Sequence, residues 1–393
     1  MSLFSFKKQS TLSFVFDVRD ASITLAAVRL EKGEKSEFIF CQNFSIQVKD
    51  TSDHKKYLDS MLATLDQAVL SVRKSLIKIG HTEKIKDHFF FIGSPWSISE
   101  SKMIRVQKDK SYEISNTFLE KIITNEETLD ENKIEKTSGD HNWQVLEEKI
   151  LQSKLNGYVV EKIFGKKTTD FETEIFVSFI PYEVKNKLYS FAETKLGKSR
   201  PKHAGSSILP SYSFMRDAYP EKSDFIHVDI GSFLTDIYVV KDNLIFAVAS
   251  FPSGERDILH SVVKKTKTSE HLVSSAVAIH RDENYDTVPK KDFEKQMSPQ
   301  IDAWLSKLSD TLSQFCLELD VPKDLFIAPR SELSKFIAKE IADRKEKGLK
   351  VLGMDIETQL VDEQIINNQV VNGRSFINEP GIKIDVAFLS KII

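Results

Sequence analysis

Asp229 ends a short apolar run, in a stretch whose residue types suit phosphate and magnesium chemistry. Residues 228–236 are VDIGSFLTD, and the residues able to meet a phosphate or its metal are Asp229, Gly231, Ser232, Thr235 and Asp236. A carboxylate here can hold a magnesium ion, usually through waters, while the N–H groups of a glycine turn face a phosphate. An Asp-x-Gly turn between strands is more often only a turn, so the motif is a hypothesis that needs its context.

A second strand-turn-strand arrangement of this kind lies near the N-terminus. Residues 11–17 (TLSFVFD) are an apolar run that ends in Asp17, and residues 23–30 (ITLAAVRL) are another. The polar turn between them ends in Ser22. Because the order of strand, acid-led turn and strand is the same as at Asp229, the pattern indicates an internal repeat.

Apolar periodicity places further elements around the first turn. Residues 53–80 predict a long helix that Asp53 caps and Gly80 ends, and residues 89–92 predict a strand that follows it. The pattern then changes until about residue 195, which favours a compact αβ insertion. There we expect strands at 102–106, 143–150, 158–163 and 172–179, helices at 114–123 and from 181 onward, and an exposed charged loop at 126–142.

The second half of the chain combines long helices with one further buried strand. The predicted helices span 256–265, 269–281, 298–319 and 331–345, and the strand spans 325–328. A turn at 251–254 (FPSG) precedes the first of these helices. His227, inside an apolar strand, is interpreted as a core histidine. Residues 349–373 are expected to be irregular, and residues 382–393 to close the chain onto the first lobe.

Composition excludes several classes of function. The 393 residues carry 55 basic and 58 acidic side chains, a formal charge of -3, so nothing favours nucleic acid as a partner. No apolar run approaches the roughly 20 residues that span a bilayer, and the leader MSLFSFKKQS is no secretory signal. The two cysteines, Cys41 and Cys316, indicate buried thiols in a reducing compartment. We therefore expect a cytoplasmic protein.

Two strand-turn-strand lobes followed by a late strand-turn-helix resemble the actin and Hsp70-type ATPases, and among them the FtsA branch of bacterial actin homologues with the related PilM pilus proteins. Residues 14–18 (FVFDV) with Ser22 are similar to the first phosphate motif, and VDIGSFLTD to the second. LFIAPRSEL (325–333) stands at the adenosine motif, and FPSG resembles the turn before the next helix. Residues 92–179 match the subdomain that FtsA and PilM carry in place of actin's subdomain 1B, and the opening segment is like a PilM leader.

The resemblance implies an α/β, two-lobed actin-like ATPase fold with ribonuclease H-like lobes and an inserted small α+β subdomain. The implied domains are a first lobe at 1–96, the insertion at 97–180, a return to the first lobe at 181–223, a second lobe at 224–350 and a closing segment at 351–393. ATP and Mg²⁺ would be held by Asp17, Ser22, Asp229, Gly231, Ser232, Thr235, Asp236, Gly254 and Glu270, with Asp17 and Asp229 as metal ligands. No catalytic residue is assigned.

Departures from the family pattern fall on the phosphate and adenosine loops. The first turn has Arg19, Asp20 and Ala21 where the family has glycine and hydroxyls. Asp20 would repel a polyphosphate, and Arg19 could partly offset that charge. Other replacements are Ser232 and Phe233 for glycines in the second turn, Pro329 and Arg330 for the adenosine-loop glycine pair, and Val273 for a nucleotide-holding lysine. Phosphate cradles need bare backbone, so these replacements favour weak or lost ATPase activity.

Three hypotheses follow. The first is an FtsA-type protein whose ATP controls lobe closure and polymerisation. The second, which we favour, is a pseudo-ATPase scaffold that recruits division or pilus components, such as a tubulin-like division protein or pilus assembly proteins. A sugar or acetate kinase is disfavoured, because no acid or base in a substrate cleft is evident. The C-terminus lacks FtsA's amphipathic helix, so membrane attachment would come through the leader or a partner.

Overall fold

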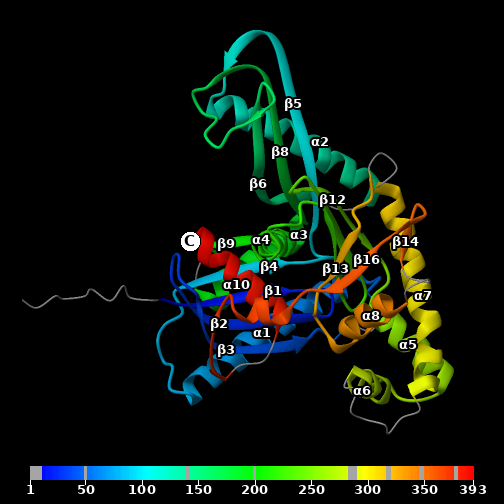
Figure 1. The fold of residues 1–393 in the computed structure, drawn as a ribbon. Coiled ribbons are helices and arrows are strands. Elements are labelled where there is room, and N and C mark those ends of the chain that lie inside the picture. The colour runs from blue at the N-terminus through cyan, green and yellow to red at the C-terminus, as the bar shows by residue number, and fades with distance from the viewer. Residues whose placement is uncertain are drawn as a thin grey trace, which may run out of the picture. The chain divides into compact units, whose positions relative to one another are not determined.

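The computed structural model describes residues 11–47, 51–138, 142–197, 201–281, 290–315, 320–344, 349–375 and 379–393. The leader and Cys316 lie outside these ranges. The chain forms two compact units, shown in Figure 1. The first comprises Met1–Gly93, Val184–Ala218 and Glu363–Ile393, and the second comprises Ser94–Glu183 and Tyr219–Asp362.

The first unit is built on a six-stranded sheet with the order β17-β3-β2-β1-β4-β9. Its strands are β1 (Thr11–Val18), β2 (Ser22–Leu30), β3 (Glu37–Ser45), β4 (Asp87–Ile92), β9 (His203–Ser206) and β17 (Val371–Ser375). Strands β1, β2 and β3 are antiparallel, whereas β4 and β9 continue the sheet in parallel with β1. The central strand β1 is buried on both faces, as its unbroken apolar run predicts.

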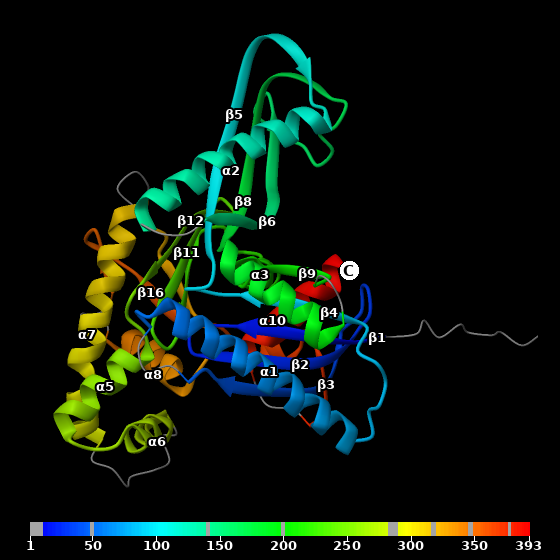
Figure 2. The ribbon, with the colours of Figure 1, turned by 180° about the vertical axis from the view of Figure 1, so that it is seen from behind.

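Helices cover both faces of this sheet. They are α1 (His54–Lys78), α3 (Tyr182–Phe191), the π-helical turn η1 (Ala192–Leu196), α4 (Ile208–Ala218), α9 (Glu363–Asn367) and α10 (Pro380–Ile392); α3 belongs to this unit from Val184 onward. Helix α1 packs on β2 and β3 on one face, and α10 packs on β1 and β2 on the other (Figures 1 and 2). The predicted helix is confirmed, because Asp53 caps α1 by accepting a hydrogen bond from the Lys56 amide.

The second unit repeats the same strand pattern. Its five-stranded sheet has the order β12-β11-β10-β13-β16, formed by β10 (Phe225–Ile230), β11 (Thr235–Lys241), β12 (Leu244–Phe251), β13 (Asp324–Ile327) and β16 (Glu357–Leu360). Strands β10, β11 and β12 are antiparallel, and β13 and β16 continue in parallel. This order matches β3-β2-β1-β4-β9 strand for strand, so the internal repeat expected from the sequence is confirmed.

Four helices enclose the core of this second sheet. They are α5 (Glu255–Thr266), α6 (Glu270–Arg281), α7 (Lys290–Phe315) and α8 (Glu332–Asp343). Trp304 of α7 is 1 % exposed and lies in the same cluster as the apolar residues of β10, β13 and α8. Residues 349–373, expected to be irregular, instead contain the hairpin β14 (Lys350–Val351) and β15 (Met354–Asp355) together with β16, α9 and the start of β17. These elements are too short to produce a periodic sequence signal.

The inserted segment is an antiparallel sheet with the order β5-β8-β6-β7 and one long helix. Its strands are β5 (Ile98–Glu113), β6 (Trp143–Leu155), β7 (Tyr158–Val159) and β8 (Lys167–Pro181), and the helix is α2 (Asn116–Ser138). The loop expected from Glu126 onward is wrong, because α2 continues to Ser138. Glu126 forms an ion pair with Lys102 at 2.7 Å, and Ile134 packs on the sheet core. Charged residues can therefore continue an amphipathic helix that already has one apolar face.

Candidate functional site

Asp17 lies at the end of β1 and is paired with an arginine from its own turn. The Arg19 Nε donates to Asp17 Oδ1, and Arg19 Nη1 donates to Ser207 Oγ at 2.6 Å. The Asp17 side chain is 3 % exposed and that of Arg19 is 13 % exposed. The guanidinium therefore bonds to the buried carboxylate directly and neutralises its charge.

The backbone of this first turn donates within the turn. The Arg19 amide donates to the Ser22 carbonyl at 2.9 Å, and the Ala21 amide donates to Asp20 Oδ1 at 2.8 Å. The Tyr57 hydroxyl donates to the Asp20 carbonyl. Asp20 thus caps its own turn, and Arg19 pairs with Asp17. The expectation that Arg19 partly offsets the charge of Asp20 stays a prediction. Ser22 contributes its carbonyl to this turn as the first residue of β2.

Gly93, which the sequence analysis did not single out, makes room for this arginine. A Cβ atom at Gly93 would lie 3.0 Å from both Cδ and Nη1 of Arg19. Gly93 follows β4, which is parallel to β1, so the two strands end side by side at the turn. The sequence signal for this role was a glycine directly after an apolar strand. That this glycine lies next to Arg19 could not be predicted without knowing that β4 pairs with β1.

Asp229, at the end of β10, is paired in the same way within the second unit. The Arg330 Nε lies 2.6 Å from Asp229 Oδ2 and 2.5 Å from Oδ1. Arg330 follows β13, and the hydrogen bond from the Ala328 amide to the Val228 carbonyl, at 2.9 Å, continues the parallel pairing up to this point. The exposed fractions of the Asp229 and Arg330 side chains are 15 % and 22 %.

The second turn is closed by the start of α5. The Gly231 amide donates to the Leu234 carbonyl at 2.8 Å. The Gly231 and Ser232 carbonyls accept from the first two amides of α5, those of Glu255 and Arg256, at 2.9 and 3.0 Å. Two of the N-terminal N–H groups that could bind a phosphate at this helix are thus bonded to the turn itself.

Gly254 permits this close approach. A Cβ atom there would lie 2.5 Å from the Gly231 carbonyl oxygen and 2.6 Å from the Ser232 carbonyl carbon. The φ angle of Gly254 is -132°, an extended value open to any residue, so the need for glycine comes from packing. Glu255, the next residue, accepts a hydrogen bond from the Ser331 hydroxyl and brings a carboxylate to the helix terminus.

Thr235 and Asp236 are engaged in contacts that hold the sheet and its helices. The buried Thr235 hydroxyl donates to the Ser253 carbonyl at 2.6 Å and accepts from Trp304 Nε1 at 3.0 Å. Asp236 accepts a hydrogen bond from Ser250, its partner in register on β12. Sequence reasoning missed Trp304, because its position on the apolar face of α7 was sufficient explanation.

The remaining predicted residues carry less information. Glu270 is the first residue of α6, and its side chain lies outside the described residues. His227 is 4 % exposed and stacks on Tyr238 with ring centroids 4.6 Å apart, which confirms it as a core histidine. Asp17 and Ser22 belong to the first unit, and all the other predicted site residues belong to the second.

These contacts do not fit an open site for magnesium and a polyphosphate. Each aspartate is paired with the guanidinium of an arginine, and several amides of both turns donate to groups of the protein. Across the described residues, no three His, Cys, Asp or Glu side chains are grouped as a metal site. The chemical role that these residues can fill is to hold each of the two turns in a fixed shape.

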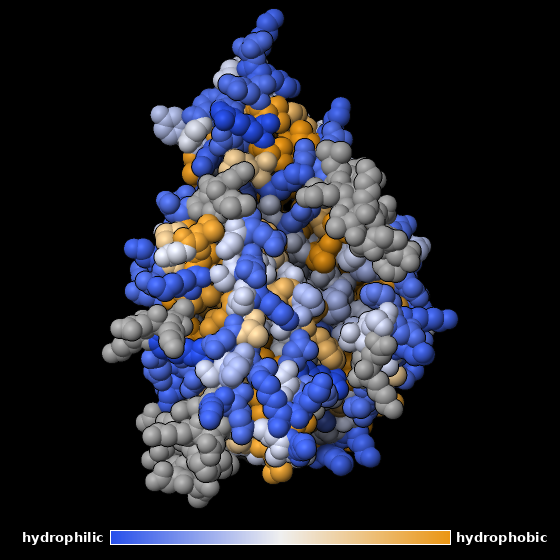
Figure 3. All heavy atoms as spheres, turned by 90° about the vertical axis from the view of Figure 1, so that its right-hand side faces the viewer, coloured by the Kyte–Doolittle hydropathy of each residue, from blue (hydrophilic) through white to orange (hydrophobic). Residues whose placement is uncertain are grey.

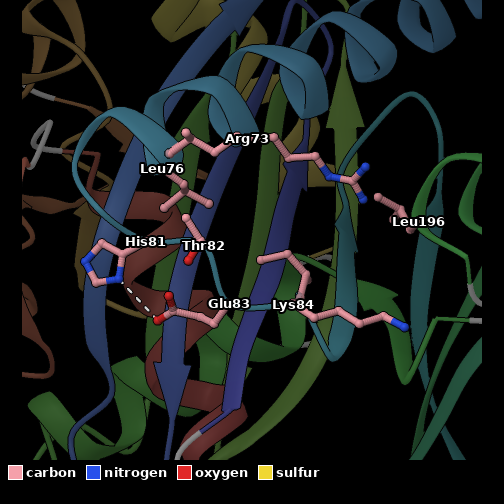
Figure 4. A pocket seen from close by; sticks show the side chains of 9 residues that line it. Arg73, Leu76, His81, Thr82, Glu83, Lys84 and Leu196 are labelled. Atoms are coloured by element: carbon pink, nitrogen blue, oxygen red, sulfur yellow. Dashed lines mark hydrogen bonds and ion pairs between the residues drawn. The ribbon is translucent and has the colours of Figure 1, made fainter.

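A pocket of about 330 Å³ lies elsewhere in the first unit, at the C-terminal end of α1 (Figure 4). Glu83 in its wall bonds to Arg29 at 2.6 Å and to His81 at 3.2 Å. Its own backbone N–H and these two side chains lower the pKa of Glu83 to about 2. Residues 81–85 of the pocket precede β4, whereas Asp17 is paired with Phe91 near the end of that strand. The pocket is thus separate from the Asp17 turn of the same unit.

Comparison with known proteins gives a fold but no family. No protein-family model matches the chain, and no curated protein matches it. The chain of a "PilM-PilN type IV pilus biogenesis complex" is similar in structure, with a TM-score of 0.59 and 11 % identity, over 96 % of this chain and 98 % of that one. A Bacteroides thetaiotaomicron protein described as having an actin-like ATPase fold and unknown function gives 0.45 and 12 %, over 97 % and 99 %. The ethanolamine utilization protein EutJ from Carboxydothermus hydrogenoformans gives 0.43 and 12 %, over 87 % and 85 %.

The chain has an α/β actin-like ATPase fold, as the repeated sheets and the likeness to the PilM chain show. Among the described helices, none combines the length and apolar character needed to cross a bilayer. Hydrophilic residues predominate on the face shown in Figure 3, where hydrophobic residues form separate groups.

Proposed function

We propose that this protein is an actin-like scaffold that recruits protein partners without turning over ATP. One observation carries the proposal: each aspartate expected to hold magnesium is instead paired with an arginine of its own unit, Asp17 with Arg19 and Asp229 with Arg330. The arginines stand where the resembled family has glycines. The same substitutions therefore remove the bare backbone and supply a fixed cation.

Binding magnesium at either aspartate would require the arginine paired with it to leave. A charge-assisted hydrogen bond contributes about 1.5–3 kcal/mol. Mg²⁺ also dehydrates reluctantly and is usually held by one or two carboxylates together with substrate phosphates. In either unit, a magnesium-bound phosphate would thus have to offset an ion pair and open a turn in which several amides are already bonded. This cost supports a role in which the fold is kept for its surfaces.

The finer assignment favours an adaptor of a type IV pilus or secretion assembly. The structure of PilM was solved in a complex with PilN, and this chain shares its fold over nearly its whole length. The partners are then pilus assembly proteins at the cytoplasmic face of the membrane. This protein would attach to the membrane through its leader or through those partners. The alternative is an FtsA-type division scaffold that binds a tubulin-like protein and polymerises. The order of the motifs in the sequence supports this alternative.

Thermal unfolding with and without millimolar Mg-ATP tests the central claim. We expect equal melting temperatures for the wild type, because a ligand that binds the native state raises the melting temperature. Asp229→Asn is the matched variant: a rise in the wild type that this variant abolishes would show a working magnesium site and refute the proposal. Sedimentation of the wild type with and without nucleotide then separates a monomeric adaptor from a nucleotide-driven polymer.

A further inference from the structure

Helix α1 carries an apolar stripe on the side turned away from its sheet. Leu70 is 65 % exposed and Ile77 is 64 % exposed, and the exposed Ala63 precedes them on the same helix. Figure 2 shows this side of α1 facing the viewer. A shallow depression of about 560 Å³ on it is lined by Ala63, Asp66, Gln67, Leu70, Ser71 and Lys74. Large apolar side chains this exposed, with regular spacing, indicate a contact surface.

The spacing suits one particular partner, another helix. Ala63, Leu70 and Ile77 follow one another at intervals of seven residues. Over each interval the direction of the side chain around the helix axis changes by only about 20°. The three side chains therefore form a nearly straight line along the helix. A line of one apolar residue in each heptad, with polar residues on both flanks, can meet a second helix along its length.

The stripe is complementary to itself when a second copy runs antiparallel about a twofold axis at Leu70. Ala63 then lies opposite Ile77 of the second copy, so a small side chain meets a large one at both ends. Leu70 meets Leu70 at the axis. Such an isologous contact uses the same patch on both partners and closes as a dimer.

The charges beside the stripe fit the same arrangement. Asp66 lies four residues before Leu70 and Arg73 three residues after it, on the same flank of the helix. With a rise of about 1.5 Å per residue, the twofold axis brings Asp66 of one copy opposite Arg73 of the other. On the other flank, Gln67 comes opposite Lys74. Within its own unit, Asp66 bonds to Lys195 Nζ at 2.9 Å, and Arg73 donates to the Lys195 carbonyl at 3.3 Å. The Asp66 side chain is nevertheless 37 % exposed and Arg73 is exposed, so a second copy can reach both.

We propose that this protein self-associates through an antiparallel α1–α1 contact centred on Leu70. A single pair of helices buries less than the roughly 1,200 Å² of a stable interface, so the dimer is weak in dilute solution. It becomes populated where many copies are held close together, which suits a scaffold. The contact needs no nucleotide, and it is independent of the ion pairs at the two turns.

Disulfide trapping tests the position of the axis. A disulfide needs Cα atoms within about 7 Å, which two antiparallel helices provide at the axis but not one turn away from it. Leu70→Cys should therefore form a covalent dimer under mild oxidation at least about tenfold faster than the matched variant Gln67→Cys. Equal rates, or no dimer of Leu70→Cys beyond the wild-type background, would overturn the proposal.

Charge variants test the pairing itself by sedimentation velocity at high protein concentration. Asp66→Lys should lower the dimer fraction because it faces Arg73 of the second copy, and adding Arg73→Asp should restore it. Leu70→Asp should abolish the dimer with an unchanged melting temperature, because Leu70 is mostly exposed. A monomeric wild type at the highest concentration, or a dimer that Leu70→Asp leaves intact, would rule the contact out.

Discussion

Pairing between Asp229 and Arg330 predicts a large coupling free energy in a double-mutant cycle. The variants are Asp229→Asn, Arg330→Met and the two combined. Asn keeps the shape of the aspartate without its charge, and Met keeps most of the apolar length of arginine. Each single variant leaves one charged or polar group without its partner, whereas the double variant removes both.

The magnitude follows from burial and distance. The Arg330 Nε lies 2.5 and 2.6 Å from the two carboxylate oxygens, and the side chains are 22 % and 15 % exposed. Removing one partner of a fully buried pair costs about 3–5 kcal/mol, and an exposed pair contributes about 0–1 kcal/mol. A pair between these limits should give a coupling of about 2 kcal/mol. If Arg330→Met alone destabilises by a similar amount, its melting temperature should fall by about 4–8 °C for a unit of this size.

Urea unfolding of the four proteins measures the coupling, with the exposed pair Lys350–Asp355 as control. Those side chains are 53 % and 80 % exposed, so their cycle should give less than about 0.5 kcal/mol. If the two cycles give equal coupling, Arg330 does not hold Asp229 in solution. The explanation of the closed turn would then be wrong, and the aspartate would be available to a metal.

Three further substitutions test the packing of the two units. Gly254→Ala should destabilise by about 1–3 kcal/mol in urea unfolding, because its Cβ would lie 2.5 Å from backbone; an unchanged midpoint would contradict the close approach. Thr235→Val should cost about 1–3 kcal/mol by the same measurement, since it leaves the buried Trp304 N–H without its acceptor. Burial lowers the pKa of Lys383 to about 8, below the ordinary 10.5. The unfolded chain then binds the extra proton above pH 8, so stability should rise from pH 8 to 9, and Lys383→Met should remove that rise; a slope unaffected by the substitution would refute this origin.

Local patterns sufficed to predict the repeated part of the fold. Strand, acid-led turn and strand at residues 11–30 and 225–241 are each encoded by contiguous residues, and both arrangements are present in the structure. The long helix after Asp53 follows from its apolar spacing for the same reason. The end of α2 was missed because residues beyond Glu126 have few large apolar side chains, and a helix can extend past its apolar face. The predicted domain boundaries stay predictions.

The partners of the two aspartates could be identified only from the tertiary fold. Arg330 is 101 positions from Asp229 in the sequence, and it reaches the carboxylate only because β13 pairs in parallel with β10 and both strands end at the same edge. From the sequence alone, Pro329 and Arg330 could be interpreted only as large side chains that fill the adenine-binding site of the resembled family. Arg19 is only two residues from Asp17 in the sequence, but it is also next to the acid Asp20. The sequence alone could not decide which of the two acids it pairs with.

The two arginines give the retained aspartates a role that requires no metal. Asp17 and Asp229 end equivalent strands of the repeated sheets, and in each unit the arginine lies in a loop where the resembled family has glycine. An unpaired carboxylate at the end of a buried strand would be costly, so an acid at this position needs either a metal ion or a cation of the protein beside it. This chain supplies a cation at both places. A scaffold built in this way keeps both turns in one shape whether or not nucleotide is present, so its recruitment of partners should not respond to ATP. Partner binding that changes with Mg-ATP in a pull-down would contradict this conclusion directly.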